Sequence, residues 1–91
     1  MFVVRVNVFE NEENAKALKK NINNYFPAYT EVLPNNSDLT AVYVGPFRTK
    51  GDIDNNIEFI YEISETNSGV LQRVKKSYLF LFYLWCISAV I

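Results

Sequence analysis

The sequence contains no histidine and a single cysteine, Cys86. A lone cysteine cannot form a disulfide within the chain, and most zinc sites and serine-type catalytic triads depend on histidine. The remaining groups for acid–base catalysis would be isolated carboxyl groups. We therefore expect no metal, no cofactor and no catalytic residues, and an enzyme is the least expected class of protein.

Neither sign of charge is in excess. The chain has 9 basic and 10 acidic side chains and a net charge of -1, so it offers no basic field to attract nucleic acid. Its 91 residues, of which 49% are hydrophobic and 21% charged, suit one small globular domain with a thin core. The start, MFVVRVNVFE, has no basic region followed by a long apolar run and does not resemble a signal peptide.

The chain repeats a strand-like phrase. A shift of 38 places aligns VRVNVF, residues 4–9, with VYVGPF, residues 42–47. The same shift aligns the apolar and capping residues that follow: Asn11 with Thr49, Ala15 with Ile53, Ile22 with Ile60, Val32 with Val70, and Leu33 with Leu71. This match in one register predicts two copies of a β-α-β unit.

The first unit begins with a predicted strand over residues 2–9, which is dense in β-branched and aromatic residues. Asn11 can cap the helix that follows, because its side-chain oxygen can accept a free amide proton of the first turn. Pro27 is expected to end this helix before a strand over residues 27–33. The apolar stripe of the helix, at helical spacing, is Ala15, Leu18, Ile22 and Tyr25.

The second unit begins with a predicted strand over residues 39–44, which Gly45 and Pro46 are expected to break. Thr49 and Asp52 then resemble a capping box at the start of the second helix. The buried stripe of that helix is predicted to be Ile53, Ile57, Ile60 and Tyr61. A turn at residues 67–69 leads into a fourth strand over residues 70–74.

The order β-α-β-β-α-β predicts an α+β, ferredoxin-like fold, in which two helices cover one face of a four-stranded antiparallel sheet. The first and third strands should form the central pair, and the other face of the sheet should be open. We assign this domain to residues 1–76. Residues 77–91 form an apolar C-terminal segment without a charged side chain.

Two segments resemble the SPOR (sporulation-related repeat) domain: VYVGPFRTKGDI, residues 42–53, and FVVRVNVFENEENAKAL, residues 2–18. The resemblance extends over roughly residues 2–74. It implies a non-catalytic module of the bacterial cell envelope, on the periplasmic side, which acts in envelope or division processes. Such a module binds the glycan strands of peptidoglycan, preferably strands that lack stem peptides, through the open face of the sheet.

Alternation along the strands assigns side chains to this open face. If Val4, Val6, Val42 and Val44 face the helices, the outward residues are Val3, Arg5, Asn7, Ala41 and Tyr43. The second strand adds Tyr29 and Glu31. In the fourth strand the pattern does not decide between Gln72 and Arg73.

Sugar binding uses flat aromatic rings for the faces of the sugar and planar polar groups for its hydroxyl and acetamido groups. The candidate glycan-binding residues are therefore Arg5, Asn7, Tyr29, Tyr43 and Gln72. A purely structural role for a tyrosine and an arginine that cover a sheet stays open. The chain departs from the usual family residues on this face: Arg5 replaces Gln, Asn7 replaces Gly, Val8 replaces Ser and Ala41 replaces Arg.

The residues at the end of each predicted central strand are expected to have a structural role. Gly45 lets the backbone bend, Pro46 ends the ladder of hydrogen bonds, and Phe47 fills the core under a helix. Phe9 has the same expected role in the first unit.

Two features leave alternatives open. The acidic row Asp54, Glu58, Glu62 and Glu65 suits a solvated helix face or the basic surface of a partner. Residues 77–91 suit membrane contact, packing on the domain or on a partner, or the product of a disrupted reading frame. The chain could accordingly be a protein-interaction or membrane-tethered scaffold.

RNA-recognition domains share the element order, but their basic, aromatic-rich signature is missing here and no nucleic acid is expected. The oligomeric state is not predicted.

Overall fold

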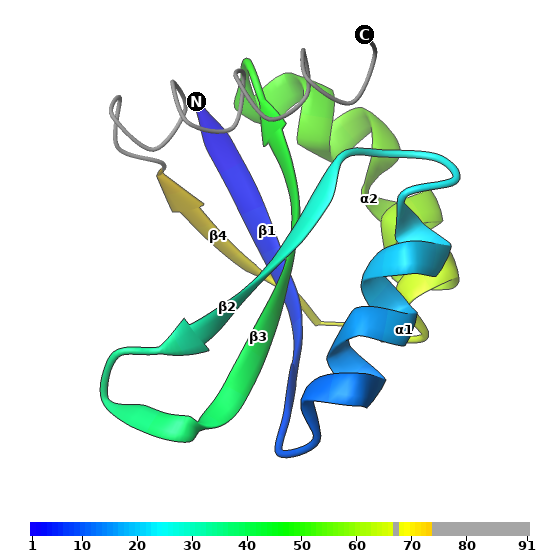
Figure 1. Ribbon diagram of the computed structural model, residues 1–91. Coiled ribbons are helices and arrows are strands. Elements are labelled where there is room, and N and C mark those ends of the chain that lie inside the picture. The colour runs from blue at the N-terminus through cyan, green and yellow to red at the C-terminus, as the bar shows by residue number, and fades with distance from the viewer. Residues whose placement is uncertain (67, 74–91) are drawn as a thin grey trace, which may run out of the picture.

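The chain forms six elements: β1 (Phe2–Phe9), α1 (Glu12–Ile22), β2 (Ala28–Leu33), β3 (Asn36–Phe47), α2 (Lys50–Ser64) and β4 (Val70–Arg73). A computed structural model describes residues 1–66 and 68–73. The strands form one sheet in the order β2-β3-β1-β4, with antiparallel neighbours, and both helices lie on one side of it (Figure 1). The predicted ferredoxin-like α+β fold and its central pair of strands are confirmed, whereas the prediction for residues 77–91 lies outside the described residues.

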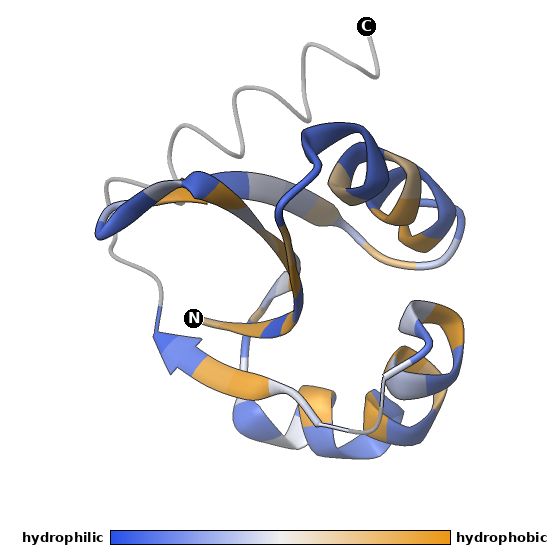
Figure 2. Ribbon diagram, turned by 90° about the horizontal axis from the view of Figure 1, so that it is seen from below, coloured by the Kyte–Doolittle hydropathy of each residue, from blue (hydrophilic) through white to orange (hydrophobic). Residues whose placement is uncertain are grey.

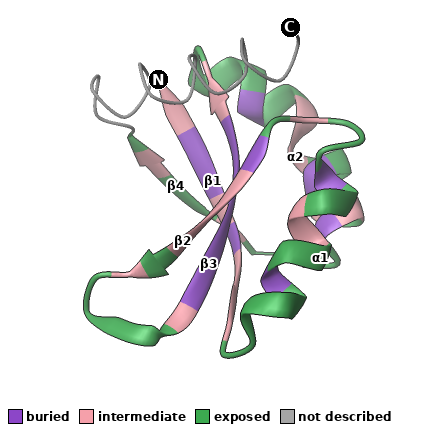
Figure 3. Cartoon of the chain, viewed as in Figure 1, coloured by how far each residue is buried: buried purple, intermediate pink, exposed green. Residues whose placement is uncertain are grey.

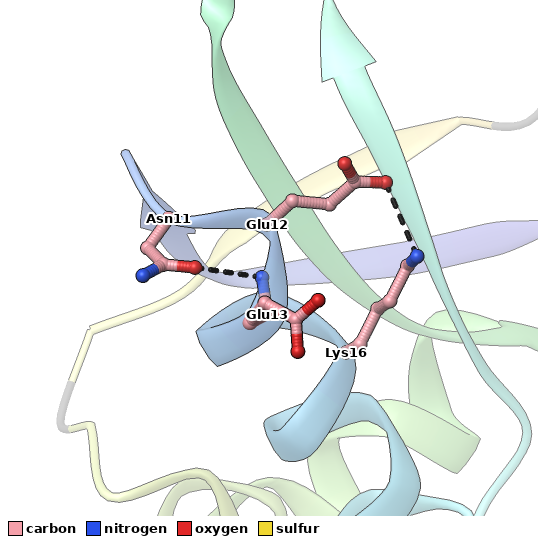
Figure 4. Close-up of polar contacts among 4 residues, drawn as sticks. All are labelled: Asn11, Glu12, Glu13 and Lys16. Carbon is pink, nitrogen blue, oxygen red and sulfur yellow. Dashed lines mark hydrogen bonds and ion pairs between the residues drawn. The ribbon is translucent and has the colours of Figure 1, made fainter.

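Both helices begin at the predicted caps. The Glu13 amide donates to Asn11 Oδ1 at 2.8 Å, as Figure 4 shows, and the Asp52 amide donates to Thr49 Oγ1 at 3.1 Å. Each bond satisfies one of the free amide groups of a first helical turn. In the part of the chain that is described, neither helix is long and apolar enough to cross a membrane.

The main core lies between the sheet and the helices. Its buried members come from the two central strands, from β2 and from both helices: Val4, Val6, Ala15, Ile22, Ala28, Val42, Val44, Ile53 and Ile60. Phe9 and Phe47 pack against this core from the ends of β1 and β3. Buried residues follow the middle of β1 and β3 in Figure 3, and hydrophobic and hydrophilic residues alternate along the helices in Figure 2.

The first helix is shorter than its apolar stripe predicts. It ends at Ile22, and Tyr25, which was expected on the buried stripe, lies beyond the helix and is 57% exposed. Asn23 is the C-cap of the helix, and its Oδ1 accepts the Ala28 amide at 2.9 Å, which ties the helix end to the start of β2. The chain therefore turns toward β2 before Pro27 is reached.

The prediction that Gly45 and Pro46 end the third strand is wrong. β3 continues to Phe47, which pairs with Phe2 of β1, and the Gly45–Pro46 peptide bond is cis. Gly45 has φ of 130°, and its amide donates to the Pro27 carbonyl at 2.8 Å. The strand is thus displaced at this point, where the register with β1 shifts between Phe2 and Val4, and then resumes.

Candidate functional site

The outer face of the sheet, which the helices do not cover, carries a row of side chains across all four strands. The register pairs Tyr29 with Tyr43, Tyr43 with Arg5, and Arg5 with Val70. Side chains of directly paired residues project from the same face of a sheet. This row therefore contains three of the five candidate residues, Arg5, Tyr29 and Tyr43.

The two tyrosines of this row form a stack. Their ring centroids are 5.0 Å apart and the rings are inclined by only 17°. The Arg5 side chain forms a hydrogen bond to Tyr43 from the other side. The result is a continuous polar-aromatic surface over β2, β3 and β1, with two aromatic rings next to a guanidinium group.

Tyr43 lies on the outer face, as predicted, but it is buried there. Only 6% of Tyr43 is exposed, because it belongs to a second apolar cluster on the outer face. The buried centre of this cluster is Val3, Ala41 and Tyr43, and Val8, Tyr29 and Leu33 pack against it. Tyr43 thus forms the floor of the surface, with Tyr29 and Arg5 beside it.

The surroundings of Tyr43 favour its neutral form. Burial is the main cause that raises the pKa of its hydroxyl above the ordinary value of 10.0, and the Glu31 carboxylate adds to the effect. The charge of Arg5 and its hydrogen bond to Tyr43 act in the opposite direction. At neutral pH the Tyr43 hydroxyl is therefore protonated.

Asn7 does not join this row, which corrects the prediction from strict alternation. The register of β1 against β3 shifts between Arg5 and Asn7, so that Asn7 pairs with Val42 and Val8 pairs with Ala41. Val42 belongs to the core under the helices, whereas Ala41 belongs to the outer cluster. The extra residue in β1 thus places Val8, rather than Asn7, on the outer face, and Asn7 Oδ1 accepts the Val8 amide at 2.9 Å.

Strand pairing also settles the orientation of β4. Gln72 pairs with Val3, and Val70 pairs with Arg5, so both lie on the outer face. Arg73 pairs with Phe2 and lies over the Phe2 ring, with its guanidinium carbon 5.7 Å from the ring centroid. Gln72 is therefore the polar residue of β4 on the candidate surface.

Sequence reasoning missed the apolar floor of the surface and the place of Val8 and Val70 on it. The signal available was the pair Val3 and Ala41, since two apolar residues at outward positions indicate that the face is partly covered. Within residues 1–66 and 68–73 no group of three or more histidine, cysteine or acidic side chains could hold a metal ion. The arrangement offers stacking on aromatic rings together with hydrogen bonds from Arg5 and Gln72, which is the chemistry of a binding surface.

These features define a small binding module with a polar-aromatic sheet face. The family model described as "SPOR domain" matches residues 2–67, and the chain belongs to this peptidoglycan-binding family. SPOR domains bind peptidoglycan and act on it in the cell envelope, including in bacterial cell division. The match identifies a binding domain and no catalytic domain.

Solved structures agree with this fold. The SPOR domain of RlpA from Pseudomonas aeruginosa matches with a TM-score of 0.65 and 17% identity, over 81% of this chain and 100% of that one. The peptidoglycan-binding domain of the cell wall lytic enzyme CwlC from B. subtilis matches with a TM-score of 0.59 and 19% identity, over 79% of this chain and 89% of that one. The Spor protein DedD matches with a TM-score of 0.53 and 22% identity, over 78% of this chain but 37% of that one. Among curated proteins no sequence matches.

Proposed function

We propose that this chain binds the glycan strands of peptidoglycan through the outer face of its sheet, with a preference for strands that lack stem peptides. Membership of the SPOR family supports peptidoglycan as the ligand. The observation that carries the choice of surface is the row Tyr29, Tyr43 and Arg5 across neighbouring strands. We further propose that it acts on the periplasmic side of the bacterial cell envelope.

In this proposal Tyr29 provides the sugar-stacking ring. It lies on the edge strand β2 and is partly exposed, whereas Tyr43 is held beneath the surface by the outer cluster. Arg5 and Gln72 are the hydrogen-bonding groups for hydroxyl and acetamido oxygens. Tyr43 positions both Tyr29, through the ring stack, and Arg5, through their hydrogen bond.

A sedimentation assay with isolated sacculi tests the proposal. The full chain should sediment with sacculi, and more of it should sediment after an amidase has removed the stem peptides. Tyr29→Ala and Arg5→Ala should each weaken binding by about tenfold, in line with the loss of one well-placed contact in a small binding site.

The matched control for Arg5→Ala is Arg48→Ala. Arg48 is exposed and follows β3, so this variant makes the same change in net charge away from the outer face. Equal binding by the two arginine variants would refute the role of the outer face. Failure of the unmodified chain to sediment with either form of sacculi would refute the proposed function itself.

A further inference from the structure

The helical layer carries an exposed aromatic patch that glycan binding by the sheet does not use. Tyr25 and Phe59 are 57% and 41% exposed, and their rings pack edge to face with centroids 5.1 Å apart. Phe26 joins Phe59 to the core, with centroid distances of 5.7 Å to Phe59 and 5.8 Å to Phe47. We call Tyr25 and Phe59 the helix-layer patch. Aromatic side chains held rigidly at a surface are typical of the centre of protein interfaces.

The two helices beside this patch differ in charge: α2 is mainly acidic, whereas α1 has Glu12 and Glu13 in its first turn and Lys19 and Lys20 in its last turn, the end nearer to Tyr25. On α1 the exposed Lys16 and Lys20 are four residues apart and share one face of the helix. On α2 the exposed Asp54, Glu58 and Glu62 follow the same spacing. The helices are adjacent, since Asn21 Nδ2 of α1 donates to the Ile63 carbonyl of α2 at 3.3 Å.

The acidic row of α2 is not neutralised within the described residues. One ion pair joins Lys16 to Glu12 within α1, with Nζ 3.4 Å from Oε1. Carboxylates four residues apart on one helix repel each other, so a cation brought against α2 would relieve this repulsion. The patch and its charged borders therefore fit a surface that is apolar in the middle, acidic on one side and basic on the other.

We propose that this surface binds a second copy of the chain in a symmetric dimer. A two-fold axis that runs along the line between α1 and α2 sets α1 of one copy against α2 of the other. Lys20 of each copy then meets the acidic row of its partner, twice by symmetry, while Tyr25 and Phe59 meet their own copies at the axis. A second copy of this chain therefore offers a lysine to the acidic row of α2 and an acidic row to the lysine of α1.

Such a dimer is back to back, because the helices lie on the opposite side of the sheet from the outer face. The two outer faces would point away from each other and remain free. If each binds a ligand, the dimer is bivalent and can join two strands of a polymer, or gain avidity where both sites reach the same meshwork. The dimer itself does not depend on what the outer face binds.

A charge-exchange experiment on the full chain tests the dimer. Lys20→Glu and Glu62→Lys are measured singly and as an equal mixture by sedimentation velocity at low salt. Each variant alone places like charges against each other at both symmetric contacts, so its dimer dissociation constant should rise by about tenfold or more. In the mixture, opposite charges meet again at both contacts, and dimers should return as heterodimers.

Phe59→Ser tests the apolar centre, and Val32→Ser is its matched control. Val32 is 49% exposed and lies on the edge strand β2 rather than on a helix. Phe59→Ser should weaken the dimer by about tenfold or more, and Val32→Ser should leave it unchanged. The proposal is overturned if the unmodified chain stays monomeric at about 1 mM, where even a weak interface is populated. It is equally overturned if the mixture of the two charge variants remains monomeric. Association that is insensitive to all of these substitutions would also overturn it, because contacts made by residues 77–91 would give that result.

Discussion

Replacement of Tyr43 by alanine should destabilise the domain, although Tyr43 lies on the face of the sheet that carries no helix. Only 6% of this residue is exposed, and it fills the outer cluster with Val3 and Ala41. Truncation of a buried aromatic side chain to alanine costs about 3–5 kcal/mol, and the stack on Tyr29 adds roughly 0.5–1.5 kcal/mol. Because one side of this cluster is a surface, we expect the low end, about 3 kcal/mol.

Tyr43→Phe separates the ring from the hydroxyl. It keeps the buried ring and the stack but removes the hydrogen bond to Arg5, so it should cost about 1 kcal/mol. The assay is urea unfolding followed by far-UV circular dichroism, with the free energy of unfolding extrapolated to water. For a domain of this size, a loss of about 3 kcal/mol should also lower Tm by about 12–24 °C.

Tyr25→Ala is the matched control, since it makes the same truncation at a residue that is 57% exposed. It should cost less than about 1 kcal/mol. The reasoning is refuted if Tyr43→Ala costs no more than this control, which would mean that the outer cluster is not a stabilising core. For the same reason Tyr43→Phe, and not Tyr43→Ala, is the variant suited to tests of glycan binding.

Three further outcomes follow from the described contacts. Because burial raises the pKa of Tyr43, the folded chain holds this proton more tightly than the unfolded chain. The free energy of unfolding should therefore fall as pH rises above about 10. In Tyr43→Phe this dependence on pH should be weaker, as measured by urea unfolding between about pH 9 and 11.5. Gly45→Ala should lower the free energy of unfolding by about 1–3 kcal/mol, because φ is 130° and the new Cβ would lie 3.1 Å from the Phe2 carbonyl oxygen. An unchanged urea midpoint would refute this backbone conformation at Gly45. Thr49→Ala should cost about 1 kcal/mol through loss of the cap to the Asp52 amide, and Thr49→Ser should restore most of it.

Local patterns predicted the elements and their order because their causes are local. Asn11 and Thr49 cap helices through bonds to residues two and three places away, and both form as expected. The repeated phrase around Val4 and Val42 also predicted the central pair of strands, since each half of the fold needs one central strand.

The site was predicted less well because it depends on pairing between strands. The alternation of side chains along one strand does not reveal the extra residue in β1, which places Val8 instead of Asn7 on the outer face. The burial of Tyr43 depends on Tyr29 and Val3, which come from two other strands. Likewise, Gln72 could be assigned to the outer face only once its pairing with Val3 was known.

Val8 and Ala41 are two of the positions at which this sequence departs from the residues expected of a SPOR domain, and they pair directly across β1 and β3. Both side chains are apolar and belong to the outer cluster. They therefore make an apolar contact between the two central strands on the outer face. Beside this contact Glu31 of β2 pairs with Ala41, and Arg5 and Gln72 lie on the β1 and β4 side of the outer face. A ligand on this face would meet a carboxylate on the β2 side and the guanidinium group of Arg5 on the β1 side, with apolar side chains between them.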